Sequence, residues 1–333
     1  MTQTIELAHR LPAGIGLHPL GPGFAAEVTG IDLTGPLSPA QEQAIREMWI
    51  AAGVLVFRNQ AHDDAAQMRL SRLFGEMEPA ATADMNDPDN RFMMTLAYDP
   101  EDRNPRFQQH YNVGGSDRAG WIGWHWDQSF MPTIVRGAVL RMELPAARMG
   151  ETGFIDGIGA WERLPGDLKA RIEGLEVVYA FNPDFASGQF GFPDDIRPLP
   201  RATPGATAGR EPQYDFPPVV HPLVITQRET GRKVLKLSPM HARYVLGMAR
   251  AESDALLAEV ARALVDERFA YFHHWQRNDM VVWDNWRVIH LANGVPLDVP
   301  RRARRTTIMG DYKVGRYLDP ALDRERQVKR IVD

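Results

Sequence analysis

Two histidines that lie far apart in the chain constrain its fold more than any other feature. His125 and Asp127 belong to the run Gly-Trp-His-Trp-Asp, and His290 ends the run Val-Val-Trp-Asp-Asn-Trp-Arg-Val-Ile-His. In an extended strand, residues i and i+2 project from the same face, so His125 and Asp127 can face one ion while Trp124 and Trp126 point away. Two histidines and one carboxylate on one side of an ion form the facial triad of non-haem Fe(II) oxygenases.

The His-x-Asp pair has other interpretations when it is taken alone. A chain of this composition contains on the order of one His-x-Asp by chance, and a buried histidine paired with a neighbouring carboxylate is a common structural arrangement. A second match, His62-Asp-Asp64, lies between the apolar run Val54 to Phe57 and a helical pattern from Ala65 to Leu73. Acidic residues suit the start of a helix, so we interpret this second match as structural.

The segment after His290 adds arginines in a strand-like pattern. Arg301 and Arg305 belong to the run Arg-Arg-Ala-Arg-Arg-Thr-Thr-Ile, so in a strand their side chains share one face. A guanidinium matches a carboxylate in bidentate geometry, which suits a dicarboxylate cosubstrate near a metal. The alternative is a basic edge strand that resists aggregation, and we expect that role for Arg302 and Arg304 on the opposite face.

Several motifs occur in one order along the chain. Trp-His-x-Asp is followed by Gly-Glu-Thr152-Gly-Phe, then by Trp-Asp-Asn-x-x-x-x-His and by Arg-Thr-Thr-Ile-Met-Gly-Asp311. In order and spacing the chain resembles the taurine and 2,4-dichlorophenoxyacetate dioxygenase family of Fe(II)/2-oxoglutarate enzymes. The resemblance extends from Glu27 to Asp311 and so covers most of the chain.

The resemblance implies a role for each matching residue. His125, Asp127 and His290 would bind iron, Thr152 and Arg301 would hold the distal carboxylate of 2-oxoglutarate, and Arg305 would lie close to the cosubstrate and to an anionic group of the substrate. Relatives that halogenate have a small residue at the position of Asp127, so this carboxylate favours hydroxylation.

The substrate-binding positions transfer less directly. Phe130, just after the iron motif, is a candidate for a pocket wall. Trp121 stands where taurine enzymes have an asparagine four positions before the first ligand, which argues against a taurine-like substrate. His110 and Tyr111 are candidates for polar substrate contacts, although an ordinary loop histidine and tyrosine would look the same.

The remaining pattern predicts mixed β and α structure. Ser38-Pro39-Ala-Gln41 predicts a helix start, with a short buried strand at Val54 to Phe57. We expect helices at 160–173, 239–248 and 253–265, and a hairpin of 221–226 with 233–237. The resemblance implies a double-stranded β-helix, or jelly roll of the cupin kind, with helices packed outside, as one domain over residues 1–333.

A stretch rich in proline and glycine separates these elements at 182–218. It indicates either a lid or a surface insertion. As a lid, its residues Phe185, Phe190 and Phe192 would close on a hydrophobic substrate, because loops that exclude water commonly do so. Alternatively, the three rings anchor the loop to the body of the protein.

Composition excludes several classes of protein. The 333 residues carry a net charge of −5 and no cysteine, so a disulfide framework and thiolate metal sites are excluded. We find no apolar run of the length of a membrane span, no secretory signal and no basic tract suited to nucleic acid. We therefore expect a cytoplasmic enzyme with a small anionic substrate, without nucleic-acid or membrane partners, and a homo-oligomer, either a dimer or a tetramer.

The function expected from these features is hydroxylation of a small aryloxyalkanoate-, sulfonate- or amino-acid-like anion. The cofactors would be Fe(II), 2-oxoglutarate and O2, and the cosubstrate would leave as succinate and CO2. One alternative is another metal-dependent enzyme, a hydrolase or an isomerase, which would not need Thr152, Arg301 and Arg305 together. A second alternative is a non-catalytic ligand-binding protein on the same scaffold.

Overall fold

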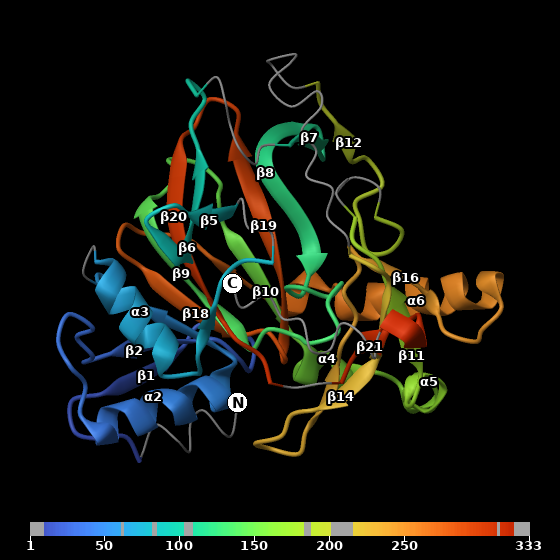
Figure 1. Ribbon diagram of the computed structural model, residues 1–333, viewed down its shortest axis with the longest axis horizontal. Coiled ribbons are helices and arrows are strands. Elements are labelled where there is room, and N and C mark those ends of the chain that lie inside the picture. Colours follow the sequence, from blue (N-terminus) through green and yellow to red (C-terminus); the bar gives the residue numbers. More distant parts are fainter. Residues whose placement is uncertain are drawn as a thin grey trace.

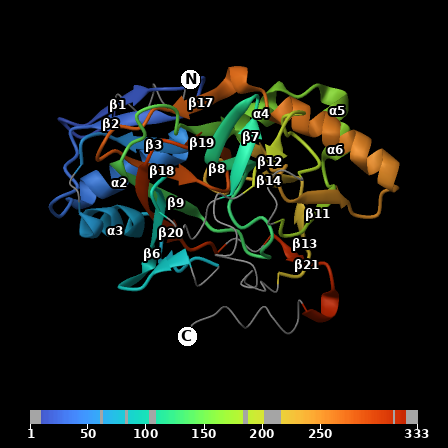
Figure 2. The same ribbon diagram turned by 90° about the horizontal axis from the view of Figure 1, so that it is seen from above.

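The computed structural model describes residues 10–60, 63–81, 85–102, 109–182, 188–200, 216–311 and 314–322. Two largely antiparallel sheets stand face to face in the middle of the molecule (Figures 1 and 2). Helices cover the outer face of one sheet, and further helices with a small third sheet cover the other. The protein is therefore a mixed β and α protein, as the sequence predicts.

The larger sheet carries the arginine-rich strand. Its strands in spatial order are β1 (Gly16–Pro19), β2 (Ala26–Thr29), β3 (Val54–Phe57), β18 (Met280–Asp284), β9 (Gly137–Leu144), β20 (Arg301–Ile308), β6 (Asn90–Tyr98) and β5 (Asn86–Asp87), and β4 (Met77–Glu78) also pairs with β20. All pairings are antiparallel except that of β2 with β3.

The second sheet carries both histidines of the predicted metal site. Its strands in spatial order are β12 (Arg197–Pro198), β7 (His110–Val113), β8 (Ser116–His125), β19 (Val288–Pro296), β10 (Thr152–Asp156) and β17 (Ala270–His273). Strand β8 therefore lies directly beside β19, although the two are far apart in sequence.

Alternating side chains fill the space between the two sheets. In β18, Val281 and Trp283 point into this space, whereas Met280 and Val282 point to the outer face. From the second sheet, Phe154 meets Trp283 with ring centroids 5.8 Å apart. Successive residues of a strand point to opposite faces. These strands are apolar at every position because both of their faces are buried.

Helices α2 (Pro39–Ala52) and α3 (Asp64–Arg72) cover the outer face of the larger sheet. The predicted start of α2 is confirmed: Ser38 caps the helix, and its capping box with Gln41 is complete. Gly53 ends α2 at a φ of 74°, which favours glycine. The predicted strand β3 follows at once.

The outer face of the second sheet packs on α4 (Gly157–Arg163), α5 (Gly166–Ile172) and α6 (Arg250–Leu264). A third sheet lies with them and contains β16 (Ala242–Val245), β11 (Glu176–Tyr179), β13 (Val219–Pro222) and β21 (Arg316–Tyr317). The predicted hairpin is confirmed as β14 (Val224–Thr226) with β15 (Lys233–Leu235), but His221 and Pro222 belong to β13.

Two helix predictions need correction. The helix expected at 160–173 is divided into α4 and α5, because Pro165 lacks an N–H and holds Leu164 in an extended conformation. The helix expected at 239–248 is instead the strand β16, which pairs with β11 through Val245 and Tyr244. Pairing with a buried neighbour overrides a weak helical pattern here.

The edge-strand interpretation of Arg302 and Arg304 is wrong. Strand β20 lies inside its sheet, between β9 and β6. Arg304 forms ion pairs with Asp64 (2.8 Å) and Asp87 (2.6 Å), so it joins α3 and β5 to the sheet. Asp64 is thus a structural residue, and His62 of the same motif lies outside the described residues.

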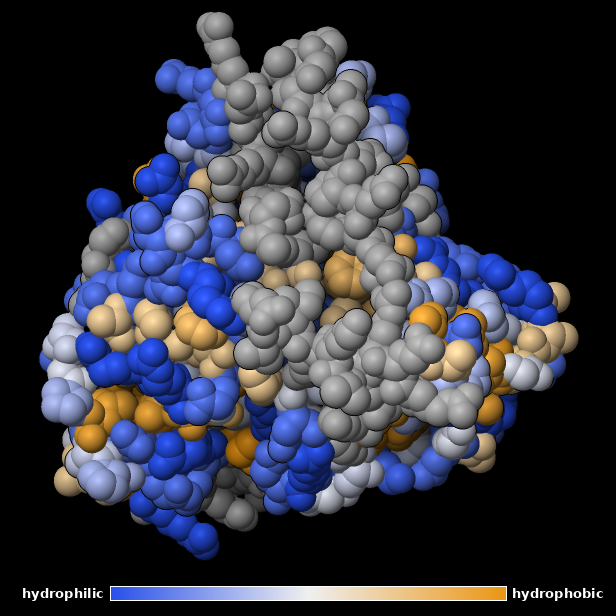
Figure 3. Space-filling view, in the orientation of Figure 1, coloured by the Kyte–Doolittle hydropathy of each residue, from blue (hydrophilic) through white to orange (hydrophobic). Residues whose placement is uncertain are grey.

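Hydrophilic side chains cover most of the described part of the face in Figure 3, with apolar residues in small groups between them. Leu144 and Met309 are the large hydrophobic residues described as exposed. Within the described part of the chain, no helix has the length and apolar character needed to cross a membrane.

We expect the buried ion pair of Arg287 and Asp156 to stabilise the junction of three elements. Arg287 donates to both carboxylate oxygens of Asp156 (2.7 and 3.1 Å) and to the carbonyl oxygens of Ile50 and Ala51 in α2. Asp156 also caps α4. Asp156→Asn should lower the free energy of unfolding by about 3–5 kcal/mol at pH 7, because it leaves a buried charge without its partner. Urea denaturation measures this change.

An exposed ion pair provides the matched control. Arg171 and Glu259 are about half exposed, so Glu259→Gln should change the free energy of unfolding by less than about 1 kcal/mol.

The pH dependence of stability gives a second test of the buried pair. Burial raises the pKa of Asp156, but Arg287 outweighs burial and the net pKa is lowered. The difference between wild type and Asp156→Asn should therefore persist at neutral pH and shrink as the pH falls below about 4. A pH-independent difference would contradict this assignment.

Candidate active site

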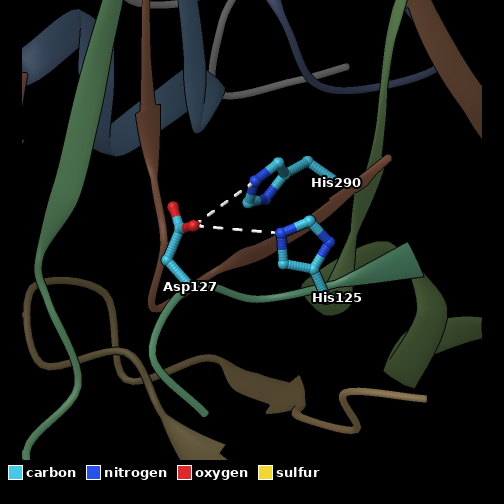
Figure 4. A group of neighbouring side chains, drawn as sticks. All are labelled: His125, Asp127 and His290. Carbon is cyan, nitrogen blue, oxygen red and sulfur yellow. Dashed lines mark ion pairs between the residues drawn. The ribbon is translucent and has the colours of Figure 1, made fainter. Parts of the chain in front are cut away.

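The pairing of β8 with β19 places the two histidines opposite each other. His125 and His290 are partners in the antiparallel register, and their ring centroids are 4.2 Å apart. Asp127 follows two residues after the end of β8, and its Oδ1 lies 3.9 Å from Nε2 of His125 and 3.6 Å from Nε2 of His290. Figure 4 shows the three side chains pointing toward one another. One ligand atom from each lies within 4.8 Å of the others.

Hydrogen bonding and burial prepare the two rings as neutral ligands. Nδ1 of His125 lies 2.7 Å from the carbonyl oxygen of Gly123, so this nitrogen carries the proton and Nε2 is left with its lone pair. Burial lowers the pKa of both histidines, and for His290 the neighbouring His125 lowers it further. Both imidazoles are therefore neutral near pH 7, which is the form that binds metals.

Arg305 holds the other oxygen of the Asp127 carboxylate. Its Nη2 lies 2.7 Å from Oδ2, whereas Oδ1 faces the two histidines. Burial would raise the pKa of Asp127, but Arg305 and the histidines outweigh burial and hold that pKa far below its usual range. Arg305 also lies over the ring of Trp283, 5.5 Å from the centroid. The carboxylate is thus ionised, with Oδ1 available to an ion.

Asn285 fixes the backbone of Asp127. Its Oδ1 accepts from the N–H of Asp127 (2.8 Å), and its Nδ2 donates to the carbonyl oxygens of Asp127 (3.2 Å) and Val135 (3.0 Å). The buried ammonium of Lys236 donates to the carbonyl oxygen of Asn285 and lies 4.6 Å from the ring centroid of Trp126. Sequence reasoning missed both residues, although Asn285 belongs to the Trp-Asp-Asn run before His290.

Thr152 and Arg301 face the same interior from opposite sheets. Thr152 is buried in β10 on the face that carries Phe154, and Arg301 shares its face of β20 with Ala303 and Arg305. Among the described residues, none forms an ion pair with Arg301, and burial lowers the pKa of its guanidinium to about 10. An unpaired, partly buried cation fits an anionic ligand.

Phe130 lies in an aromatic cluster that the sequence did not reveal. Its ring contacts Phe216 (4.7 Å between centroids), Phe181 (4.9 Å) and His241 (5.2 Å). His241 is buried, its Nδ1 has no hydrogen-bond partner among the described residues, and burial is the main reason that its pKa is lowered to about 3. These four rings come from four separate segments, so no local pattern signals them.

The other predicted substrate residues lie in a separate small cluster. Trp121, Tyr111 and Val113 pack together, and Phe192 meets Trp121 at 5.9 Å. His110 begins β7, with its ring 5.9 Å from that of Tyr98. The substrate roles of Trp121, Tyr111 and His110 stay predictions. Phe192 anchors its loop in this cluster, Phe190 is buried in the core beside α6, and Phe185 lies outside the described residues.

The donor set fits a particular class of metal site. Two neutral imidazoles and one ionised carboxylate are gathered at one point in a buried interior, with no thiolate in the chain. Such a set suits a mononuclear non-haem Fe(II) centre that keeps positions open for other ligands. Arg301, which has no ion-pair partner among the described residues, faces the same interior and suits the carboxylate of an organic acid.

Comparison with known proteins agrees with this class. The model of the family "Taurine catabolism dioxygenase TauD, TfdA family" matches residues 17–307. The 2,4-dichlorophenoxyacetate dioxygenase of Cupriavidus pinatubonensis, which depends on alpha-ketoglutarate, is 31% identical over 89% of this chain and 98% of its own. An alpha-ketoglutarate-dependent sulfate ester dioxygenase of Pseudomonas putida is 26% identical over 90% of this chain and 91% of its own.

The chain therefore belongs to the TauD/TfdA dioxygenase family, and it is an oxidoreductase that uses Fe(II), 2-oxoglutarate and O2. A solved structure supports the same conclusion: AAD-2 in complex with Mn(II) and N-oxalylglycine is 26% identical and superposes with a TM-score of 0.68 over 90% of this chain and 99% of that chain. The predicted family and cofactors are confirmed.

We expect Asn285 to act on the metal site through Asp127. Asn285→Ala removes all three hydrogen bonds to the loop that carries the carboxylate. It should weaken Fe(II) binding roughly 10- to 100-fold, as changes behind metal ligands typically do. Equilibrium titration with Fe(II) under anaerobic conditions measures this.

The control is another buried asparagine at a turn remote from the triad. Asn112 donates to Asp117 across the turn between β7 and β8. Asn112→Ala should bind Fe(II) like the wild type. Equal losses in both variants, or an unchanged affinity in Asn285→Ala, would show that the contacts of Asn285 do not hold the ligand.

Proposed function

We propose that this protein hydroxylates a small anionic organic substrate, with an aryloxyalkanoate-like acid as the leading class. His125, Asp127 and His290 hold the iron. Thr152 and Arg301 hold the distal carboxylate of 2-oxoglutarate, and Arg305 attracts the anionic group of the substrate. Sulfonate-like and amino-acid-like anions are the second candidates for the same site.

One observation carries this assignment: the carboxylate of Asp127 is shared between the histidine pair and Arg305. An anion attracted to Arg305 is thereby kept close to the metal ligands. Nε of Arg305 has no hydrogen-bond partner among the described residues, so the guanidinium keeps a donor for such an anion. Geometry of this kind selects the reacting carbon by its distance from the anionic group.

The chemistry divides between the bound groups and the protein. When bound, Fe(II), 2-oxoglutarate and O2 convert a C–H bond of the substrate to C–OH, and the cosubstrate is released as succinate and CO2. The residues of the chain orient the substrate, place the cosubstrate and exclude water. A hydrolase or isomerase would have no use for Arg301, for which the described part of the chain offers no ion-pair partner, and the shared 2-oxoglutarate dependence of the relatives disfavours both.

The aromatic cluster around Phe130 favours a substrate with an aromatic body. Phe130 is three residues after Asp127, and its ring contacts those of Phe181, Phe216 and His241. The relatives include dioxygenases named for 2,4-dichlorophenoxyacetate and for (S)-phenoxypropionate. If the hydroxylated carbon bears the ether oxygen, the product can collapse and release a phenol.

The two facing sheets support a double-stranded β-helix as the core of a single domain. Residues 182–218 would add a lid or insertion to it, and the anchored rings of Phe190 and Phe192 favour a fixed base for that segment. Cytoplasmic location, assembly as a dimer or tetramer, and the absence of nucleic-acid and membrane partners remain predictions.

We expect Fe(II)-loaded protein to give a weak visible charge-transfer band when it is titrated anaerobically with 2-oxoglutarate. His125→Ala should lose the band because it loses the metal. Arg301→Met should keep Fe(II) but require roughly 10- to 100-fold more 2-oxoglutarate, since a charge-assisted hydrogen bond contributes about 1.5–3 kcal/mol. The dissociation constants come from the same titration.

Two controls accompany this titration. Arg302 is exposed on the opposite face of β20, so Arg302→Met should bind 2-oxoglutarate like the wild type. His62→Ala should retain near-normal activity. If Arg301→Met and Arg302→Met bound 2-oxoglutarate with the same affinity, Arg301 would not be the carboxylate ligand. If the wild type gave no charge-transfer band, the proposed function itself would be wrong.

We expect aryloxyalkanoates to stimulate succinate formation more than alkylsulfonates do. Succinate and phenol should form in equal amounts, and Phe130→Ala should raise KM for the aryl substrate about tenfold or more, while KM for an alkylsulfonate changes little. A panel of both classes, followed by succinate release, measures this. Higher kcat/KM for alkylsulfonates in the wild type would transfer the assignment to the second class.

A further inference from the structure

Trp275 forms a hydrogen bond that links it to the proposed cosubstrate site. Its indole Nε1 donates to Oγ1 of Thr152 at 3.0 Å. Trp275 lies two residues beyond the end of β17, and the last residue of that strand, His273, pairs with Thr152 of β10. Thr152 is buried, so its hydroxyl group has few other partners available.

The chemistry of the two groups fixes the direction of this bond. An indole N–H can only donate, whereas a threonine hydroxyl can donate one hydrogen and accept at two lone pairs. Oγ1 of Thr152 must therefore be the acceptor from Trp275. The hydroxyl hydrogen is left over and turns toward another acceptor. A threonine held in this way presents a donor to its surroundings and is suited to an anion.

A buried polar network holds the ring of Trp275 in place. His273 packs edge-on against Trp275, with centroids 4.4 Å apart and an angle of 87° between the planes. His273 is itself fixed between the hydroxyl of Tyr271 (2.8 Å) and the carboxylate of Asp279 (3.0 Å). Asp279 also accepts from Arg58. Because these partners are buried, the indole has a fixed orientation toward Thr152.

Arg301 lies against the same segment of chain. A side-chain carbon placed at Gly150 would come within 3.8 Å of Cδ of Arg301. Gly150 is two residues before Thr152, so the stem of Arg301, whose guanidinium has no ion-pair partner among the described residues, lies beside the segment that leads into the strand of Thr152. Two donors of different kinds can then hold one carboxylate.

We propose that Trp275 is a positioning residue that makes Thr152 a hydrogen-bond donor to the distal carboxylate of 2-oxoglutarate. This inference rests on the proposed function, in which Thr152 and Arg301 hold that carboxylate. Trp275 acts only through Thr152 and touches neither the iron nor the reacting atoms. Its effect should therefore appear in cosubstrate affinity and not in the affinity for Fe(II).

A double-mutant cycle tests this role. The dissociation constant of 2-oxoglutarate is measured by the charge-transfer band for Fe(II)-loaded wild type, Trp275→Phe, Thr152→Val and the double variant. Trp275→Phe keeps a ring but loses the N–H, and should weaken 2-oxoglutarate binding about tenfold. Thr152→Val should weaken it at least as much. In the double variant, Trp275→Phe should add no further loss, because the hydroxyl on which it acts is gone.

Three further measurements separate positioning from general structural support. Fe(II) affinity and kcat at saturating 2-oxoglutarate should stay near the wild-type values in Trp275→Phe. Thr152→Ser should retain most of the cosubstrate affinity, because it keeps the hydroxyl. Weak binding of 2-oxovalerate, which lacks the distal carboxylate, should be the same in wild type and Trp275→Phe.

Several outcomes would overturn the inference. Losses that multiply in the double variant would show that Trp275 acts by packing and not through the hydroxyl. An unchanged 2-oxoglutarate affinity in Trp275→Phe would show that the hydrogen bond has no role in binding. If Trp275→Phe does not fold, replacing Trp275 with 3-benzothienylalanine removes the N–H in an almost identical shape, and the same cycle decides. If the wild type gives no charge-transfer band, the proposed function is wrong as well. If the wild type gives the band but the losses of the two single variants multiply in the double variant, only the role of Trp275 is wrong.

Discussion

The antiparallel pairing of β8 with β19 is the interaction on which the rest of the site depends. It sets His125 opposite His290, and the period of two along each strand turns both rings into the space between the sheets. A shift of either strand by one residue would turn its histidine to the opposite face, where Trp124 and Leu291 pack in the helix-covered core. Apolar side chains are buried on both faces of these strands. Their burial therefore fixes the register of β8 and β19.

Charged groups lie behind this interior in an unusually buried arrangement. Arg287 with Asp156 and Arg136 with Asp284 form ion pairs in or beside the turn between β18 and β19, and Lys236 binds the same turn at Asn285. Burial lowers the pKa of Lys236 to about 7, with Asp284 and Asp127 opposing that shift. Buried ion pairs contribute little net stability compared with apolar packing, but they fix geometry. The turn that they fix carries Asn285, and through it the backbone of Asp127.

Local patterns in the sequence predicted what depends on few residues. The structure brings the predicted residues His125, Asp127 and His290 together, and helix α2 begins as predicted because its capping residues are local, whereas the cosubstrate roles of Arg301 and Arg305 stay predictions. The strand β16 was missed because its pairing with β11 depends on residues far away in sequence. Arg304 was misinterpreted for the same reason, since only the sheet order shows that β20 is internal. The aromatic cluster around Phe130 and the contact of Trp275 with Thr152 also join distant segments, and no spacing rule signals them.

The two oxygens of Asp127 have different partners, and this division would let one carboxylate act both on a metal and on an anion bound by Arg305. Oδ1 faces the histidines and Oδ2 faces Arg305. A metal held by the triad would draw negative charge toward Oδ1 and would weaken the hold of Oδ2 on Arg305, so the guanidinium would become more available to an external anion. Metal binding and anion binding at Arg305 would then be coupled through this single side chain, in both directions. Replacing Asp127 with a neutral residue would remove both the metal ligand and this coupling. The carboxylate can have both roles only because it lies between the histidine pair and Arg305.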